Sequence, residues 1–503
     1  MVYGNEIKGS FFVVFCLVVD VVHVKSTSTW FASSEMGSVK KSELLYSEMF
    51  YTQILDHFTF TPQSNQTFQQ RYLFNNSNWG GSQSNAPIFV YTGNEGDIDW
   101  FAQNTGLMFD IAPRFKALLV FIEHRFYGKS VPFGGDKKVA YSNASTLGYL
   151  TSTQALADYA TLILDLKKNM SALDSPVVVF GGSYAGMLAA WFRLKYPHLA
   201  IGAVASSAPI LSFEHITSPY SFFDIVSKDY KSASENCCRV IKNSWKQISE
   251  AVKDSEESEM LRTKFRLCEN SSVDHLTGWL GRALIYTAMT DYPTPSNFLN
   301  PMPAYPVKQM CNEIDDPEKG NDTFFKLHAA ANIYYNYTGS VQCFNPGNHS
   351  DSHGMQMWNW QASTEMIMSV GGSSNSSIFP SSKWDYRSDG IPETNYWGVK
   401  SRPFWITTEF GGHNIKRVLK KFGSNIIFFN GLRDPWSGGG VLENISTTIV
   451  AIVAKKGAHH VDLRFASNED PKWLTRVRER EIKIIANWLQ EYYDELAKTN
   501  PFI

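Results

Sequence analysis

The sequence predicts an α/β fold in which one parallel sheet is interrupted by a large, mostly helical insertion. Residues 45–205 and 400–495 alternate short β-branched runs with helical segments, as in a parallel sheet covered by helices. Residues 206–399 show a different sequence pattern: strand-like runs are few, and cysteines, proline-containing turns and helical segments are frequent. We therefore expect a discontinuous α/β core and an inserted helical cap.

The individual elements follow from the same runs. An expected strand is a short stretch rich in β-branched or aromatic residues, and an expected helix is a longer stretch between turn signals. The expected strands are 87–92, 117–123, 176–180, 201–206, 424–430 and 447–454. The expected helices are 156–168 and 187–194 in the core, 234–252 and 323–335 in the insertion, and 481–496 near the end.

Composition places the chain among globular proteins with a sizeable core. Of the 503 residues, 43% are hydrophobic and 19% are charged, and the length allows two domains or one domain with a large insertion. The formal net charge is −2 and no basic run occurs, so the charge pattern does not favour nucleic acid as a partner.

The N-terminus has the pattern of a secretory signal, which we place at residues 1–25. An apolar run at 11–19 follows Lys8 and is broken by Asp20. Such a run is too short to span a bilayer but fits the hydrophobic region of a signal peptide. The alternative is a plain N-terminal extension. No later segment has the length and apolarity of a membrane helix.

Sequons also favour the secretory pathway, with a lysosome, a vacuole or the extracellular space as the destination. Their density along the chain suggests a glycoprotein whose modified residues lie on surface loops. The candidate glycosylation sites are Asn65, Asn75, Asn143, Asn169, Asn270, Asn321, Asn336, Asn348, Asn375 and Asn444.

The cysteines favour an oxidising compartment as well. Cys16 lies in the expected signal, and the other five fall between residues 237 and 343. Such local clustering is typical of disulfides that cross-link one region. Because the number of these cysteines is odd, one of them should remain a free thiol. A zinc site is the rival explanation, but the sequence has no CxxC pair. We expect neither a metal nor a cofactor.

The motif that carries chemistry is the run from Val177 to Gly186. A β-branched strand ends at Gly181 and Gly182, Ser183 follows, and a helix-like segment begins directly after it. Strand, tight turn and helix form the layout of a nucleophile elbow, in which residues beside the strained serine must be small. The G-x-S-x-G pattern matches only with Ala185 in its last place, so an ordinary glycine-rich turn is the alternative.

A serine nucleophile needs a base and a group that orients the base. In an α/β-hydrolase these follow in the order serine, acid, histidine, each after a strand. Asp434 follows the expected strand 424–430, and His459 and His460 follow the strand 447–454. Taken singly, the Asp-Pro pair could be a turn and the histidines a surface turn or metal ligands. The required order in all three places favours catalysis, although the residues alone do not choose between the two histidines.

Two further groups complete the expected site. The oxyanion hole needs the backbone N–H of Tyr184 and one N–H from an earlier loop, for which the loop 92–97 with Asn94 is the candidate. Arg464 lies four residues beyond His460, so a helical turn would bring its charge close. A fixed positive charge disfavours imidazolium, and we expect it to keep the base neutral in an acidic compartment.

At this point the motifs resemble those of the prolylcarboxypeptidase family of serine peptidases, which includes proline-specific carboxypeptidases and dipeptidyl peptidase II. The similar segments cover the chain from about residue 50 to residue 495 and are specific when taken together. They are QILDHF at 53–58, TGNEGDI at 92–98, EHRFYGKS at 123–130, GGSYAGMLAAWFRLKYPH at 181–198, SSAPI at 206–210, DYPTPSNFLNPMPAYPV at 291–307, DPWSGGG at 434–440 and GAHHVDLR at 457–464.

The resemblance implies an α/β-hydrolase core with a helical cap over the site. It assigns Ser183, Asp434 and His459 as the catalytic residues, which resolves the choice of histidine. It also implies the disulfides Cys237–Cys311 and Cys268–Cys343, with Cys238 left free. One departure is Ser363, which occupies the place of a family cysteine.

The implied activity is cleavage of peptides next to a proline that lies near one terminus. Met187, Trp436 and Met368 are candidates for the apolar pocket, with core packing as the alternative. His460 is a further candidate for substrate binding. A homodimer is left open as the assembly.

The family leaves open which end of the peptide is bound. Arg433 and Arg464 could hold a terminal carboxylate, and Glu95 or Asp97 could hold a terminal ammonium. The segment 335–343 and Ser437 look more like a carboxypeptidase, so we expect release of a C-terminal residue after proline. The alternatives are release of an N-terminal dipeptide, a lipase or esterase with the same three residues, and an inactive binding protein.

Overall fold

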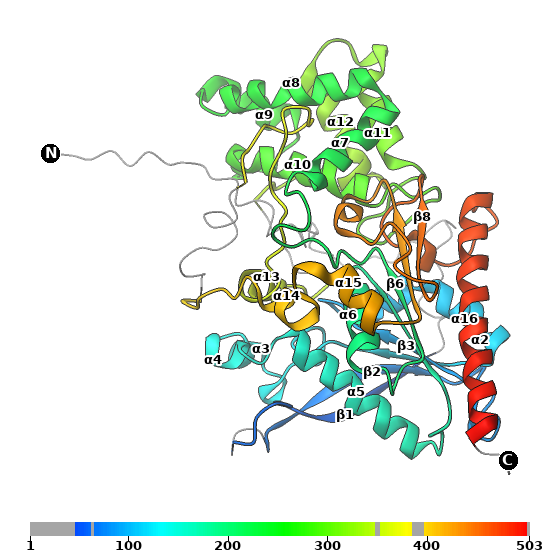
Figure 1. The fold of residues 1–503 in the computed structure, drawn as a ribbon. Helices are drawn as coiled ribbons and strands as arrows, with labels where there is room; N and C mark the ends of the chain where they lie inside the picture. The colour runs from blue at the N-terminus through cyan, green and yellow to red at the C-terminus, as the bar shows by residue number, and fades with distance from the viewer. Residues whose placement is uncertain (1–45, 62–64, 348–352, 385–396, 500–503) are drawn as a thin grey trace.

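The computed structural model describes residues 46–61, 65–347, 353–384 and 397–499. The expected signal at 1–25 and the sequon at Asn348 lie outside these residues. One eight-stranded sheet in the order β1-β2-β4-β3-β5-β6-β7-β8 forms the centre of the molecule (Figure 1). Its strands are β1 (Ser47–Ile54), β2 (Thr67–Asn75), β3 (Ile88–Thr92), β4 (Leu118–Ile122), β5 (Val177–Gly182), β6 (Gly202–Ser206), β7 (Ile426–Gly431) and β8 (Ile449–Ala454).

The sheet confirms the predicted α/β-hydrolase fold. From β4 to β8 all neighbouring strands are parallel, while β1 and β2 join one edge in antiparallel pairs. The six strands that we predicted correspond to β3–β8. The strands β3 to β7 are buried along their whole length, which explains their nearly continuous apolar sequences.

The β1–β2 hairpin is an element that the sequence analysis missed. β1 reads Ser-Glu-Met-Phe-Tyr-Thr-Gln-Ile and is mostly exposed, because it is the outer strand of the sheet. Arg71 of β2 is fully buried and forms ion pairs with Glu123, Asp97 and Asp99, at 2.6 to 3.0 Å. A strand with polar residues on both faces has no clear apolar period, so its sequence pattern does not indicate a strand.

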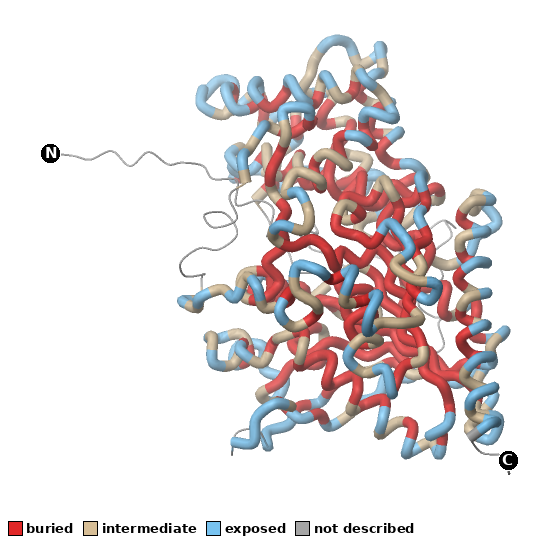
Figure 2. Tube along the Cα trace, viewed as in Figure 1, coloured by how far each residue is buried: buried red, intermediate tan, exposed pale blue. Residues whose placement is uncertain are grey.

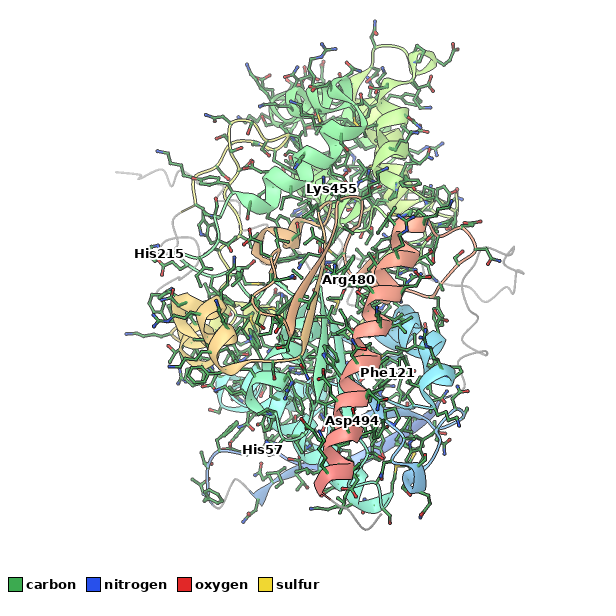
Figure 3. The ribbon with its side chains drawn as sticks, turned by 45° about the vertical axis from the view of Figure 1, so that its right-hand side comes forward. His57, Phe121, His215, Lys455, Arg480 and Asp494 are labelled. Carbon is green, nitrogen blue, oxygen red and sulfur yellow. A yellow bond between two sulfur atoms is a disulfide. The ribbon has the colours of Figure 1, made fainter. Side chains whose placement is uncertain are left out.

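Helices cover both faces of the sheet. In Figure 1, α2 (Gly106–Phe115) and α16 (Lys472–Thr499) lie to the right of the sheet, and α5 (Ser152–Asn169) and α6 (Tyr184–Lys195) lie on the other side. Figure 3 shows α16, with Arg480 and Asp494, in front of the sheet. Trp488 of α16 packs on Gly202 of β6, where a Cβ would lie 2.3 Å from the indole ring.

Most of the helices between β6 and β7 stand above the sheet in Figure 1, and the last three of them in the chain lie to the left of the sheet, near α6. In chain order, the helices between β6 and β7 are α7 (Ser221–Ala233), α8 (Glu235–Ala251), α9 (Ser255–Lys264), α10 (Leu276–Met289), α11 (Pro306–Asp315), α12 (Thr323–Tyr335), α13 (Trp358–Thr364), α14 (Trp405–Phe410) and α15 (Ile415–Phe422). Disulfides join Cys237 to Cys311 and Cys268 to Cys343, the pairs that the resemblance implies, and Cys238 is a free thiol. Figure 2 shows buried residues continuing from the sheet into these helices.

Most of the sequon asparagines in the described residues lie at the surface. Asn75 and Asn336 are half-buried, and the other sequon asparagines in the described residues are exposed. Asn336 accepts a hydrogen bond from the Val341 N–H and donates one to its carbonyl, at 2.7 and 3.2 Å. None of the helices in the described residues combines the length and apolarity needed to cross a bilayer.

Candidate active site

Ser183 occupies a strained turn between β5 and α6. Its φ and ψ are 60° and −127°, a region that serine rarely adopts. Its N–H donates to the Ser206 carbonyl at 2.9 Å, which fixes the turn to the neighbouring strand. A Cβ at Gly181 would lie 2.1 Å from the Ala185 carbonyl oxygen, so that position requires glycine. The turn therefore has the geometry of a nucleophile elbow.

Asp434 and His459 meet because two loops touch. A Cβ at Gly431, at the end of β7, would lie 2.3 Å from the Gly457 carbonyl carbon. This close approach places Oδ2 of the fully buried Asp434 2.8 Å from Nδ1 of His459. Because a carboxylate only accepts hydrogen bonds, Nδ1 carries the proton and Nε2 is left as a base.

The backbone of His459 is held by the helical insertion. Its N–H donates to the carbonyl of Met289, the last residue of α10, at 3.0 Å. Its carbonyl accepts a hydrogen bond from the Tyr292 hydroxyl at 2.9 Å. The position of this histidine therefore depends on both the sheet and the inserted helices.

His460 lies beside His459, with ring centroids 4.4 Å apart. Its N–H donates to Ser207 Oγ at 2.8 Å, and its ring packs against Gly182 of the elbow. Burial is the main cause that lowers the pKa of His460 well below its usual value, and His459 and Arg464 add to it. The positive charge of Arg464 thus contributes to the lowered pKa of His460. Its guanidinium lies 4.8 Å from the centre of the Tyr292 ring.

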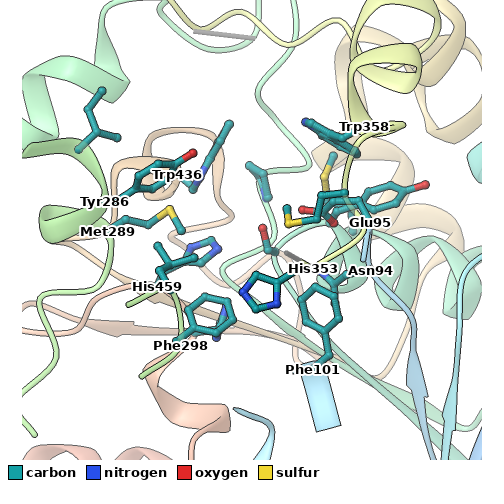
Figure 4. Close-up of a pocket in the computed structure, with 18 of the residues that line it drawn as sticks. Asn94, Glu95, Phe101, Tyr286, Met289, Phe298, His353, Trp358, Trp436 and His459 are labelled. Atoms are coloured by element: carbon teal, nitrogen blue, oxygen red, sulfur yellow. The ribbon is translucent and has the colours of Figure 1, made fainter. Parts of the chain in front are cut away.

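Ser183, His459 and His460 line one pocket (Figure 4). The space within it is about 1210 Å³, including its open mouth. Most of its wall is apolar, and the other lining residues are Asn94, Glu95, Trp100, Phe101, Tyr184, Met187, Pro209, Phe222, Ile285, Tyr286, Met289, Phe298, Leu299, Tyr334, His353, Met355, Trp358, Met368, Val370 and Trp436.

Of the candidate binding residues, five lie in this pocket, namely Met187, Trp436, Met368, Glu95 and His460. The charged candidates other than Glu95 do not line it. Arg464 donates to Asn104 at 3.1 Å and is covered by Tyr292.

Arg433 and Asp97 also lie outside the pocket lining, because each is used in an ion pair. Arg433 pairs with Asp229 and Asp291 of the insertion, and Asp97 pairs with Arg71. Sequence reasoning could not exclude these residues, since their partners are distant in the chain.

The two oxyanion candidates, Tyr184 and Asn94, both line the pocket. The Asn94 amide is already engaged: it donates to the Gly182 carbonyl at 2.9 Å and accepts from the Tyr91 hydroxyl at 2.6 Å. One N–H of this side-chain amide is thus engaged, and the backbone N–H of Asn94 is the donor that an oxyanion hole of this type would use. Tyr184 is the first residue of α6, where backbone N–H groups lack helical partners.

The side chain of Tyr184 links core and insertion. His124 Nδ1 lies 2.8 Å from the Arg125 carbonyl, so Nδ1 donates and Nε2 accepts a hydrogen bond from the Tyr184 hydroxyl at 3.1 Å. Gln361 of α13 donates to the same hydroxyl at 3.0 Å. Burial lowers the pKa of His124 to about 4, which keeps this acceptor neutral.

Several pocket residues were missed by the sequence analysis. Trp100 stacks on His353 with centroids 4.0 Å apart and donates to the Phe298 carbonyl at 2.7 Å. Met289, Met355 and Trp358 also line the wall. These residue types are ordinary for a buried core, so the sequence does not mark them as pocket residues. Phe298 could be noticed only because it lies in the proline-rich segment 291–307. No group of His, Cys, Asp and Glu in the described residues could hold a metal ion.

Comparison with known proteins identifies the family of this chain. The model of the family described as serine carboxypeptidase S28 matches residues 53–481. Lysosomal Pro-X carboxypeptidase of Homo sapiens is 40% identical over 459 residues, which cover 90% of each chain. The Bos taurus protein of that name is 41% identical over 464 residues, 91% of each chain. Prolyl carboxy peptidase like protein 5 of Caenorhabditis elegans is 36% identical over 472 residues, which cover 89% of this chain and 90% of the relative. The chain therefore belongs to the serine carboxypeptidase S28 family and is a serine-type peptidase.

Proposed function

We propose that this peptidase releases the C-terminal residue from peptides that end in Pro-X, through an acyl-enzyme on Ser183. The observation that carries the proposal is the 2.8 Å contact between His459 and Asp434 on the pocket that also holds the strained Ser183. The relatives named Pro-X carboxypeptidase support this choice of substrate.

In the proposed reaction, Ser183 Oγ attacks the carbonyl carbon of the proline. Nε2 of His459 takes the hydroxyl proton and then gives it to the amine of residue X, which leaves as the C–N bond breaks. Asp434 orients the imidazole and stabilises its charged form. The N–H groups of Tyr184 and of the loop with Asn94 are proposed to stabilise the negative charge on the tetrahedral oxygen. A water molecule, activated by His459, then hydrolyses the acyl-enzyme.

The apolar wall supports a proline beside the cleaved bond. Met187 lies one turn into α6 after Ser183, and Trp436 follows Asp434 by two residues. Met368 reaches the same space from the insertion. Methionine side chains adapt well to an irregular apolar group, so these residues can enclose the pyrrolidine ring.

The residues that the insertion adds to the pocket wall also support action at a chain end, because such a wall leaves less room for a peptide that continues past the site. The two disulfides and the lysosomal relatives support a protein of the secretory pathway, with the lysosome or vacuole as the proposed compartment.

Two measurements test the proposal. A fluorophosphonate probe should label the wild-type protein and leave S183A unlabelled. The wild type should cleave an N-blocked Pro-Phe dipeptide much faster than a free-amine Lys-Pro-chromophore. Turnover of the second substrate alone would show a dipeptidyl peptidase, and an unlabelled wild type would contradict the serine mechanism.

A further inference from the structure

The pocket contains an unusual set of charges for a site that binds a peptide terminus. Among its described lining residues there is no lysine or arginine, and the single carboxyl group belongs to Glu95. Its remaining ionisable side chains are tyrosines and the histidines His353, His459 and His460. A substrate carboxylate would therefore meet no permanently charged cation among these residues.

Glu95 is built into this pocket rather than placed at its rim. The residue is only 7% exposed, and Oε2 is buried without a hydrogen-bond partner among the described residues. It lies on the loop after β3, directly after Asn94, whose amide ties that loop to the elbow at Gly182. In Figure 4, Glu95 and His459 lie on opposite sides of the pocket.

Within the described part of the chain, no cation of fixed charge is in electrostatic contact with Glu95. The groups in electrostatic contact with it are Tyr91, Tyr127, Tyr184 and His459. Burial is the main cause that raises the pKa of Glu95, while its own backbone N–H, Asn94 and His459 oppose the shift. A buried carboxylate with one oxygen that lacks a hydrogen-bond partner among the described residues is costly, so burial favours the neutral acid.

A neutral carboxylic acid has an O–H donor, which an ionised one lacks. Hydrogen bonds from such a donor to a carboxylate are short and strong, and in a dry pocket they replace lost hydration. The terminal carboxylate belongs to the same residue X as the leaving nitrogen, which must receive a proton from His459. A donor on the wall facing His459 is therefore suitably placed for that carboxylate.

We propose that Glu95 acts as a protonated acid and hydrogen-bonds the C-terminal carboxylate of the substrate, so that this residue selects the end of the peptide that is cleaved. The proposal rests on the carboxypeptidase function and gives Glu95 a role opposite to that of an ammonium-binding carboxylate. It predicts that binding of the free acid weakens as the pH rises through the pKa of Glu95, since the ionised form repels the substrate and has no donor.

The test compares an N-blocked Pro-Phe dipeptide with its C-terminal amide, at pH values from 4.5 to 8, in wild type, E95Q and E95A. The ratio of the two KM values cancels pH effects on chemistry that both substrates share. In the wild type, the ratio of acid to amide KM should rise with pH. In E95A the KM of the acid should rise roughly 10- to 100-fold at acidic pH, with the amide little affected.

E95Q separates hydrogen bonding from charge, because its amide group donates at every pH. We expect its KM for the acid to stay low and the alkaline rise of the ratio to disappear. E365Q is the matched control: Glu365 is also buried, its pKa is raised to about 7 by burial, and it does not line the pocket. The ratio in E365Q should keep the pH dependence of the wild type.

Three outcomes would overturn the proposal. Equal KM changes for acid and amide in E95A would show a structural role. If the ratio of acid to amide KM still rises with pH in E95Q, or no longer rises in E365Q, the titrating group is not Glu95. Loss of Lys-Pro-chromophore turnover in E95Q, with Pro-Phe unaffected, would show ammonium binding. If E95A does not fold, E95Q and E365Q still decide the question. Failure of the proposed function is separate, because the wild type would then not cleave N-blocked Pro-Phe at all.

Discussion

The α/β core and the helical insertion contribute different things to one pocket. The core supplies the polar groups on loops that follow strands: Ser183 after β5, Glu95 after β3, and His459 after β8. The insertion supplies mainly apolar side chains, such as Met289 and Met368. The difference supports the proposal that the chemistry depends on groups at the ends of the strands, while part of the fit to substrate depends on the insertion.

The two regions are also stabilised differently. Parallel strands buried on both faces stabilise the core. Two disulfides cross-link the insertion, each across a separation of 74 or 75 residues. The regions are coupled where Arg433 pairs with Asp229 and Asp291, and where Met289 accepts the His459 N–H.

The largest expected effect is a loss of catalytic activity without a loss of stability, caused by a substitution in the core. In D434N the amide can still accept from the Trp436 N–H, but its NH₂ group would face Nδ1 of His459 and favour the wrong tautomer. We expect kcat to fall by about 10⁴-fold, as in other serine enzymes with this change, with little change in the melting temperature. A variant that keeps a tenth of the wild-type kcat would show that Asp434 does not orient the base.

The next effect concerns the insertion alone. C237S/C311S removes a disulfide between α8 and α11 and should lower the free energy of unfolding by about 2–5 kcal/mol, measured by thermal unfolding without reductant. The control is C238S at the adjacent position, where burial raises the thiol pKa to about 11 and no disulfide forms. We expect C238S to stay within about 0.5 kcal/mol of the wild type. Equal losses in both variants would contradict a stapling role.

The smallest effect tests the apolar wall that the insertion contributes. M368A shortens a buried side chain in the pocket and should lower kcat/KM for N-blocked Pro-Phe by about 10-fold, since a lost apolar contact is worth about 1–3 kcal/mol. M357A is the matched control, because Met357 has the same 5% exposure but packs in a separate cluster with Phe126 and Trp360. If M357A lowers kcat/KM as much as M368A, the effect is one of general packing.

Much of the core could be predicted because its signals are local. The six predicted strands correspond to β3–β8 to within a few residues, and the elbow glycine at position 181 is required by a clash with residue 185 close by. The hairpin of β1 and β2 was missed, because Arg71 finds its carboxylate partners on segments far along the chain. The same reason hid the ion pairs that occupy Arg433 and Asp97.

The sequence by itself determined the family, the order of Ser183, Asp434 and His459, and the placement of each after a strand, because these depend on neighbouring residues and on the alternation of strands and helices. Tertiary structure alone decided which side chains share the pocket. Three features depend on segments that are remote in sequence. They are the burial of Glu95, the hydrogen bond from the His459 N–H to Met289, and the packing of Met368 in the pocket. Burial and hydrogen bonding are properties of the packed molecule, so no local pattern encodes them.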